Sequence, residues 1–195
     1  MRVLVHVEHS SDDELLARLK RGDRHALGLI YSRHAARVFA FLSRLSGDRQ
    51  IAEDLFQETW LKLAQAASEL SSASDLRAWL FTVGRNAFFS QARKLARVSA
   101  LDAEPEPPAL DLEPDAALSS NRELVRLERA LARLSVIDRE VLLLVGVEAM
   151  SHEDAARVLM LEPPAFRKRL SRARARLAAL LAEDNPNHAA GGSSE

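Results

Sequence analysis

Residues 151–177 read SHEDAARVLMLEPPAFRKRLSRARARL, and this stretch decides the fold of the second half of the chain. Ser151, with Asp154 three residues later, predicts the start of a short helix, because a serine side chain can accept from the free N–H groups of a first turn. Pro163 and Pro164 predict the start of a second helix, since proline is tolerated in a first helical turn. A short capped helix, a turn of about four residues and a basic second helix form the helix-turn-helix arrangement.

The second helix concentrates positive charge in a chain that is nearly neutral. It holds six bases and no acid between Glu162 and Glu183, although the whole chain has 27 Lys+Arg against 28 Asp+Glu and a formal net charge of −1. A basic helix by itself can be a solvated surface, but after a capped helix and a tight turn it favours DNA binding. The face expected to approach DNA comprises Ala165, Lys168, Arg169 and Arg172, with Arg167 and Ser171 beside it. The inward face comprises Phe166, Leu170, Ala173 and Leu177, while Arg174 and Arg176 are expected to contact phosphates or solvent.

Residues 98–121 divide the chain into two helical halves. This segment holds six acids, no base and four of the seven prolines, so an extended, flexible linker is expected. The predicted fold is all-α, with two small helical domains joined by this acidic, proline-rich linker. The predicted parts are an N-terminal extension (1–11), a first domain (12–97), the linker (98–121), a second domain (122–182) and a disordered tail (183–195). The alternating Val3, Val5 and Val7 fit either a short strand or a disordered extension.

The first half reads as four helices. A capping box at residues 11–14 starts the first, and breaks at residues 21–23 and 46–48 separate the next two. The third is expected over residues 49–67 and the fourth from Leu76 towards Arg97. Residues expected on the inward faces are Leu27, Ile30, Tyr31, Ala35, Val38, Phe41, Leu42, Leu45, Ile51, Leu55, Trp60, Leu63, Leu76, Trp79, Leu80, Val83 and Ala87.

Two surfaces of the first half are candidates for binding. The third helix has an outer stripe of Asp54, Gln57, Glu58 and Leu61, which on generic grounds is either a solvated face or a docking surface. The fourth helix interleaves aromatic and basic residues, as proteins that bind single-stranded DNA do, although Phe88 or Phe89 could equally pack on a neighbouring helix. The interleaved residues are Trp79, Phe81, Phe88, Phe89, Arg77, Arg85 and Arg93.

Composition argues against several other functions. The chain has no cysteine, which excludes disulfides, thiol catalysis and cysteine-based metal sites. Its six histidines lack metal-ligand spacing, and no glycine-rich phosphate loop occurs, so neither an enzyme nor a metal or cofactor is expected. No apolar run is long enough to span a membrane, and the N-terminus does not read as a signal peptide, which predicts a cytoplasmic protein without membrane insertion.

The combination of AEDLFQETWLKL (52–63), LRAWLFTVGRN (76–86) and the segment 138–177 resembles an extracytoplasmic-function (ECF) sigma factor of bacterial RNA polymerase. The resemblance spans about residues 12–182 and implies sigma domain two in the first half and sigma domain four in the second. It further implies core RNA polymerase and promoter DNA as partners, and control by an anti-sigma factor. The alternative from another class is a helix-turn-helix regulator that acts without replacing the sigma subunit.

The resemblance also assigns roles to individual positions. Asp54, Gln57, Glu58 and Leu61 match the helix that docks on the polymerase. The positions matching contacts to the minus-ten element are Leu70, Ser71, Ser72, Ser74, Trp79, Arg85, Asn86 and Arg93. Those matching the helix that reads the minus-thirty-five element are Ala165, Arg167, Lys168, Arg169, Ser171 and Arg172. Met160 and Ala149 stand where the family commonly has glycine, which predicts a strain of about 1 kcal/mol at Met160 if that residue has a positive φ.

Overall fold

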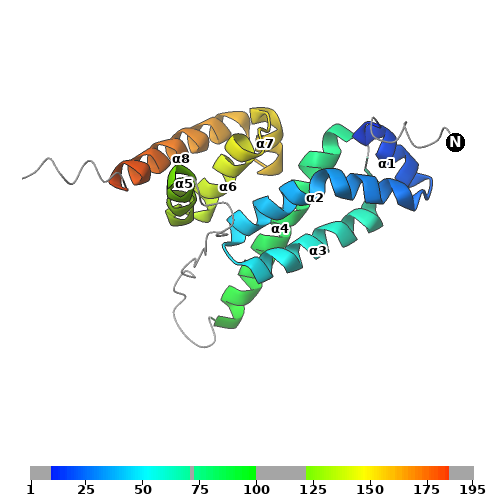
Figure 1. Cartoon of the computed structure of the whole chain (residues 1–195), viewed down its shortest axis with the longest axis horizontal. Helices are drawn as coiled ribbons and strands as arrows, with labels where there is room; N and C mark the ends of the chain where they lie inside the picture. The colour runs from blue at the N-terminus through cyan, green and yellow to red at the C-terminus, as the bar shows by residue number, and fades with distance from the viewer. Residues whose placement is uncertain (1–9, 71–72, 100–121, 185–195) are drawn as a thin grey trace, which may run out of the picture. The chain divides into compact units, whose positions relative to one another are not determined.

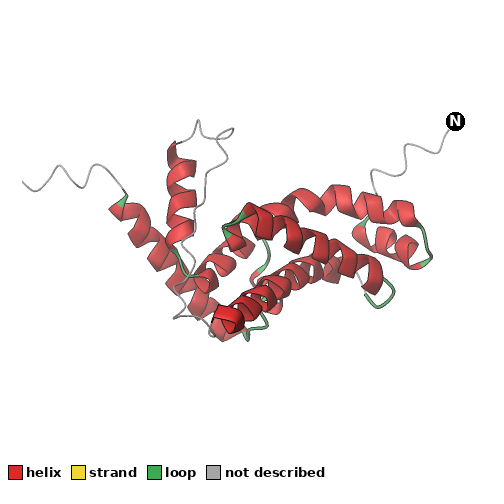
Figure 2. Ribbon diagram, turned by 90° about the horizontal axis from the view of Figure 1, so that it is seen from below, coloured by secondary structure: helices red, strands yellow, loops and turns green. Residues whose placement is uncertain are grey.

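The computed structural model describes residues 10–70, 73–99 and 122–184, and within these ranges the chain forms helices and turns but no strand (Figure 2). The chain divides into two compact units, Met1–Pro107 and Pro108–Glu195. The predicted all-α fold with two helical domains is therefore confirmed. Val3, Val5 and Val7, residues 100–121 of the predicted linker and residues 185–195 of the predicted tail lie outside the described residues.

Within the described residues, the first unit consists of helices α1 to α4, which Figure 1 labels. They are α1 (Asp12–Lys20), α2 (Arg24–Ser46), α3 (Arg49–Ala66) and α4 (Ala73–Ser99). Helix α2 contacts the other three, and α4 also packs on α1 and α3. The largest fully buried side chains of this unit are Leu15, Leu16, Ile30, Phe41, Leu42, Leu45, Leu55, Leu63, Leu76 and Phe81.

The helix starts of this unit follow from local hydrogen bonding. The predicted capping box is present: the Glu14 N–H donates to Ser11 Oγ at 3.2 Å, and the Ser11 N–H donates to Glu14 Oε2 at 3.0 Å. Asp23 and Asp48 accept from the first turns of α2 and α3 in the same way. Gly47, at φ 70°, ends α2 in the left-handed conformation that glycine adopts without strain.

A buried polar contact joins α1 to α2. The Asp12 carboxylate lies 2.7 Å from Nε2 of the buried His34 and also accepts from Arg33. Burial by itself would raise the pKa of Asp12, but the hydrogen bonds from His34 and Arg33 outweigh it and lower that pKa below its ordinary value. Asp12 therefore binds more strongly to its partners as a carboxylate than as a carboxylic acid.

Two expectations about this unit need correction. Helix α4 begins at Ala73, three residues before Leu76, and continues to Ser99. The prediction started the helix at its first apolar residue, whereas a first helical turn is often polar. Tyr31 was expected on the inward face of α2 but is 46% exposed. The other residues expected inside that are only half-buried are Leu27, Ala35, Ile51, Trp60, Trp79 and Val83.

The second unit is built around its last helix. Its elements are α5 (Arg122–Arg133), α6 (Val136–Leu142), a π-helical turn η2 (Leu143–Val147), α7 (His152–Val158) and α8 (Pro163–Glu183). Helix α8 contacts α5, α6 and α7 along its length (Figure 1). Ser151 caps α7 as predicted, because its Oγ accepts from the Asp154 N–H at 3.0 Å. Helices α7 and α8 with the turn between them thus form the predicted helix-turn-helix.

Candidate polymerase and nucleic-acid interfaces

The acidic stripe of the first unit lies on the outer face of α3. Asp54, Gln57, Glu58 and Leu61 are all exposed, and Leu61 is 64% exposed. Their spacing of three and four residues puts them on one side of the helix, opposite the buried Leu55 and Leu63. Glu58 Oε1 lies 2.5 Å from Lys62 Nζ, so one acid of the stripe also has a base one turn away. The stripe therefore offers two carboxylates and one apolar side chain to solvent.

The described residues expected near the minus-ten element lie at the end of the segment after α3 and along α4. The side chain of Leu70 is buried and belongs to the core. Its backbone carbonyl accepts a hydrogen bond from Lys20 Nζ of helix α1. Trp79 of α4 is half-buried. Ser71 and Ser72 lie outside the described residues, and Ser74 lies in the first turn of α4.

The outer face of α4 combines a cation with an aromatic ring. The Arg85 guanidinium lies 4.6 Å from the centroid of the Phe89 ring and donates to Asn86 Oδ1 at 3.4 Å. Phe89 also meets Phe88, with 5.2 Å between ring centroids. Asn86 and Arg93 are exposed on the same side of the helix. This face can stack a base on an aromatic ring and place a cation near a phosphate.

An aromatic cluster between α2 and α3 was missed by sequence reasoning. Phe56 makes edge contacts with Tyr31, Phe39 and Trp60 at centroid distances of 5.9, 5.5 and 5.9 Å. Trp60, expected in the core, is half-buried, and its buried indole Nε1 has no hydrogen-bond partner within the described structure. The sequence could have predicted this cluster, because Phe56 and Trp60 are four residues apart on α3 and lie at the edge of its apolar face.

The turn between α7 and α8 is strained at Met160, a position where the family commonly has glycine. Met160 has φ 53° and Ala149, before α7, has φ 51°, both in the left-handed region. Met160 nevertheless keeps the turn hydrogen bond from its N–H to the Arg157 carbonyl at 3.1 Å. The positive φ on which the expected strain at Met160 depends is therefore present, at a cost of about 1 kcal/mol for a residue with a side chain.

The buried and exposed faces of α8 follow the predicted pattern closely. Phe166, Leu170 and Ala173 are buried, and Leu177 is half-buried. The exposed side chains include Ala165, Arg167, Lys168, Ser171, Arg172 and Arg174.

Two bases of α8 have acidic partners on α6 that the sequence pattern did not predict. Arg169 is half-buried, and its Nη1 lies 3.7 Å from Oε1 of the fully buried Glu140. Arg176 donates to Oδ2 of Asp138, which is 4% exposed. Arg169 was expected to face DNA. Arg176 was expected to contact phosphate or solvent, and its side chain is 62% exposed while it also pairs with Asp138. Both are held by carboxylates whose burial the sequence pattern did not reveal.

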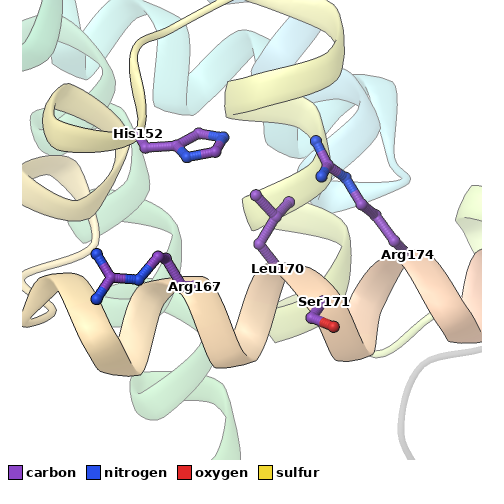
Figure 3. Close-up of a pocket in the computed structure, with 5 residues that line it drawn as sticks. All are labelled: His152, Arg167, Leu170, Ser171 and Arg174. Carbon is purple, nitrogen blue, oxygen red and sulfur yellow. The ribbon is translucent and has the colours of Figure 1, made fainter.

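A pocket of about 270 Å³ lies between the start of α7 and α8. It is lined by His152, Arg167, Leu170, Ser171 and Arg174. Figure 3 shows Arg167 and Arg174 on either side of Leu170, with His152 reaching across from α7. The lining contains two guanidinium groups and no carboxylate, a composition that suits an anion.

Comparisons with known proteins assign both units. The Sigma-70 region 2 model matches residues 30–98, and the Sigma-70 region 4 model matches residues 124–177. The chain is 32% identical to the RNA polymerase sigma factor NccH of Alcaligenes xylosoxydans xylosoxydans, over 88% of this chain and 95% of that protein. It is 37% identical to the ECF RNA polymerase sigma factor EcfG of Rhodopseudomonas palustris, over 74% of this chain and 79% of that protein.

The chain belongs to the ECF family of RNA polymerase sigma factors.

Solved structures agree with this assignment of the sigma factor. One is CnrH in complex with the cytosolic domain of CnrY, at 28% identity and a TM-score of 0.68, covering 90% of this chain and all of that chain. Another is the sigma factor RpoE in complex with the anti-sigma factor NepR from Bartonella quintana, at 33% identity and a TM-score of 0.67, covering 80% and 98% of the two chains.

The matched regions contain the surfaces described above. The region 2 match includes the acidic stripe of α3 and the outer face of α4, and the region 4 match includes the helix-turn-helix. The sigma factor therefore binds core RNA polymerase and promoter DNA to initiate transcription. Within the described residues, no helix is both long and apolar enough to cross a membrane, and no cluster of three or more potential metal ligands occurs.

Proposed function

We propose that this sigma factor docks on core polymerase through the stripe of Asp54, Gln57, Glu58 and Leu61. The proposal is supported by the exposure of all four side chains on a helix whose opposite face is buried. Two carboxylates beside an exposed leucine complement a partner surface that is basic at its edge and apolar at its centre. Docking through α3 leaves the outer face of α4 available for the DNA strand.

The outer face of α4 is proposed to hold single-stranded DNA of the minus-ten element. Arg85, Asn86 and Arg93 supply charge and hydrogen bonds, and Phe89 supplies a stacking surface. Trp79 and the segment containing Leu70, Ser71, Ser72 and Ser74 complete this proposed contact. Leu70 contributes through its backbone and through packing, because its side chain is buried.

Helix α8 is proposed to read the minus-thirty-five element, and one observation carries this part. Arg167, Lys168, Arg172 and Arg174 have no acidic partner within the described residues, whereas Arg169 and Arg176 do. The exposed face around Lys168, Ser171 and Arg172 then meets base edges, with the small Ala165 allowing close approach. Arg167 and Arg174 in the pocket with His152 hold a backbone phosphate.

The remaining parts of the proposal concern organisation and control. Residues 12–97 act as the polymerase and minus-ten domain, residues 122–182 as the minus-thirty-five domain, and residues 98–121 as the linker. An anti-sigma factor is proposed to restrain the protein, since one solved relative was crystallised with such a factor. The proposed role is non-enzymatic, needs no cofactor and takes place in the cytoplasm.

The decisive experiment measures promoter binding by the full chain with and without core polymerase. Weak, sequence-independent binding alone and selective binding with core are expected, because each basic surface is short. Co-purification of the chain with core polymerase is the second readout. Tight, sequence-specific binding by the isolated chain at physiological salt would instead favour a regulator that acts without core polymerase.

A further inference from the structure

Helix α6 carries three consecutive charged residues that are all buried. Asp138, Arg139 and Glu140 are 4%, 1% and 0% exposed. Buried charges are unfavourable unless they are paired and hydrogen-bonded. The partners of these three residues therefore indicate what the arrangement holds in place.

Arg139 faces α5. Its guanidinium donates to the carbonyls of Leu131, Ala132 and Leu134 at 2.9, 2.7 and 3.1 Å. These carbonyls lie at the C-terminal end of α5, where a cation satisfies free acceptors and complements the helix dipole. Arg139 therefore ties α5 to α6.

The two flanking acids face α8 instead. Glu140 lies 3.7 Å from Arg169, and Asp138 accepts from Arg176. Arg169 and Arg176 are seven residues apart, so both lie on nearly the same side of α8 two turns from each other. This side borders the buried face along α6, whereas Arg167 and Arg174 border it along α7.

Two ion pairs separated by two turns constrain the rotation of a helix about its axis. The apolar contacts of Phe166, Leu170 and Ala173 resist separation of α8 from the unit, but hydrophobic contacts have little directionality. Rotation of α8 would separate Arg169 from Glu140 and Arg176 from Asp138, and the buried Asp138 carboxylate would then lose its paired cation. Moving Arg176 to a DNA phosphate would have the same result at Asp138.

We infer that Arg169 and Arg176 are positioning residues, which Glu140 and Asp138 hold so that Lys168 and Arg172 face the DNA groove. This inference rests on the proposed role of α8 in reading the minus-thirty-five element. It divides the six bases of α8 into two that orient the helix and four that are free to contact DNA. Arg176 should therefore contribute to promoter selectivity without neutralising a phosphate.

The test measures promoter affinity of the holoenzyme against salt concentration and against a library of minus-thirty-five sequences. Arg176→Gln is expected to broaden the sequence preference. It should leave the salt slope, which is the slope of log promoter affinity against log salt concentration, unchanged. Its matched control, Arg174→Gln on the same helix, removes a proposed phosphate contact and is expected to lower the slope by about one. Arg176→Lys is expected to restore the preference, because an ammonium can still pair with Asp138.

A partner variant separates positioning from direct contact. Asp138→Asn is expected to broaden the preference as Arg176→Gln does, and the double variant should be no worse than either single variant. Circular dichroism checks that the helices remain. A fall of about one in the slope for Arg176→Gln would overturn the inference, as would an Asp138→Asn protein with unchanged preference. If Arg172→Gln and Lys168→Gln also leave slope and preference unchanged, the proposed role of α8 fails and the inference fails with it.

Discussion

Glu53 and Glu58 lie on the same helix, and each pairs with a base four residues away, but only Glu58 belongs to the outer stripe of α3. Glu53 Oε1 is 3.0 Å from Arg49, and Glu58 Oε1 is 2.5 Å from Lys62. Pairs of this kind stabilise a helix by about 0.3–0.5 kcal/mol. Reversing either charge therefore perturbs α3 to a similar extent, and the two positions form a matched test of docking.

Glu58→Arg is expected to weaken core polymerase binding strongly, and Asp54→Arg together with Glu58→Arg to abolish it, because the stripe then repels a basic partner surface. Glu53→Arg should leave binding nearly unchanged. Pull-down with core polymerase measures the effect, and circular dichroism confirms equal helical content. Equal losses for Glu53→Arg and Glu58→Arg would return the stripe to an ordinary solvated surface.

Gly84 marks a close approach of α4 to α2 and α3. A Cβ there would lie 3.0 Å from Leu42 Cδ2 and 3.2 Å from Thr59 Oγ1, and both neighbours are fully buried. We expect Gly84→Ala to lower the free energy of unfolding by about 1 kcal/mol, because overpacking against these two buried side chains outweighs the helix propensity that alanine adds. Gly28 of α2 has no atom near the corresponding position, so Gly28→Ala should raise it by about 0.5–1 kcal/mol. Urea unfolding of both variants gives the comparison, and stabilisation by both would refute the close contact.

The turn before α8 should become more stable when its strain is removed. Met160→Gly is expected to raise the free energy of unfolding by about 1 kcal/mol, because φ 53° carries no penalty for glycine. Met160 is 70% exposed, so Met160→Ala loses little packing and keeps the strain. Its stability should stay within about 0.5 kcal/mol of the original protein. Thermal unfolding of the two variants distinguishes strain from loss of the methionine side chain.

Asp12 should stabilise the first unit only where it is ionised. Its pKa in the folded protein is below the ordinary value of about 3.8, so its contribution is present above that value and is lost as the pH falls through the folded pKa. Asp12→Asn is expected to lower the free energy of unfolding by about 1 kcal/mol at pH 7. The difference between the two proteins should shrink below pH 3.8. A difference that does not change with pH would mean that packing, rather than charge, accounts for it.

The pocket beside α7 predicts a phosphate contact that is independent of base sequence. Arg167→Gln and Arg174→Gln in the holoenzyme should each weaken all promoters similarly and lower the salt slope by about one. Arg133→Gln is the control, because Arg133 is already paired with Glu183 and Asp184. Unchanged slopes for both pocket variants would place the phosphate elsewhere.

The helices and their caps could be predicted because local chemistry determines them. Ser11 and Ser151 are followed by an acid three residues later, and both cap a helix as expected. The inward face of α8 was also readable, because Phe166, Leu170 and Ala173 repeat at helical spacing. In these cases the residues that decide the structure are near neighbours in sequence.

The pairing of the α8 bases could not be predicted in the same way. Periodicity places charged residues outside, whereas Asp138 and Glu140 are buried and receive partners from α8, which lie 38 and 29 residues further along the chain. The burial of Leu70 and the half-exposure of Trp60 likewise depend on contacts between helices. Sequence reasoning identified α8 as the basic helix of the helix-turn-helix but did not separate its unpaired bases from Arg169 and Arg176, which are paired.

The ion pairs that Arg169 and Arg176 make with α6 also matter for engineering the protein for synthetic gene circuits. A library intended to redirect it to an artificial promoter would vary Lys168, Ser171 and Arg172, whose side chains are exposed and make no ion pair within the described residues. Glu140 and Asp138 would be kept together with the bases that they hold. With the positioning role inferred for Arg169 and Arg176, randomising all six bases would include variants in which α8 is misaligned, so the smaller library samples more usable specificities for the same screening effort.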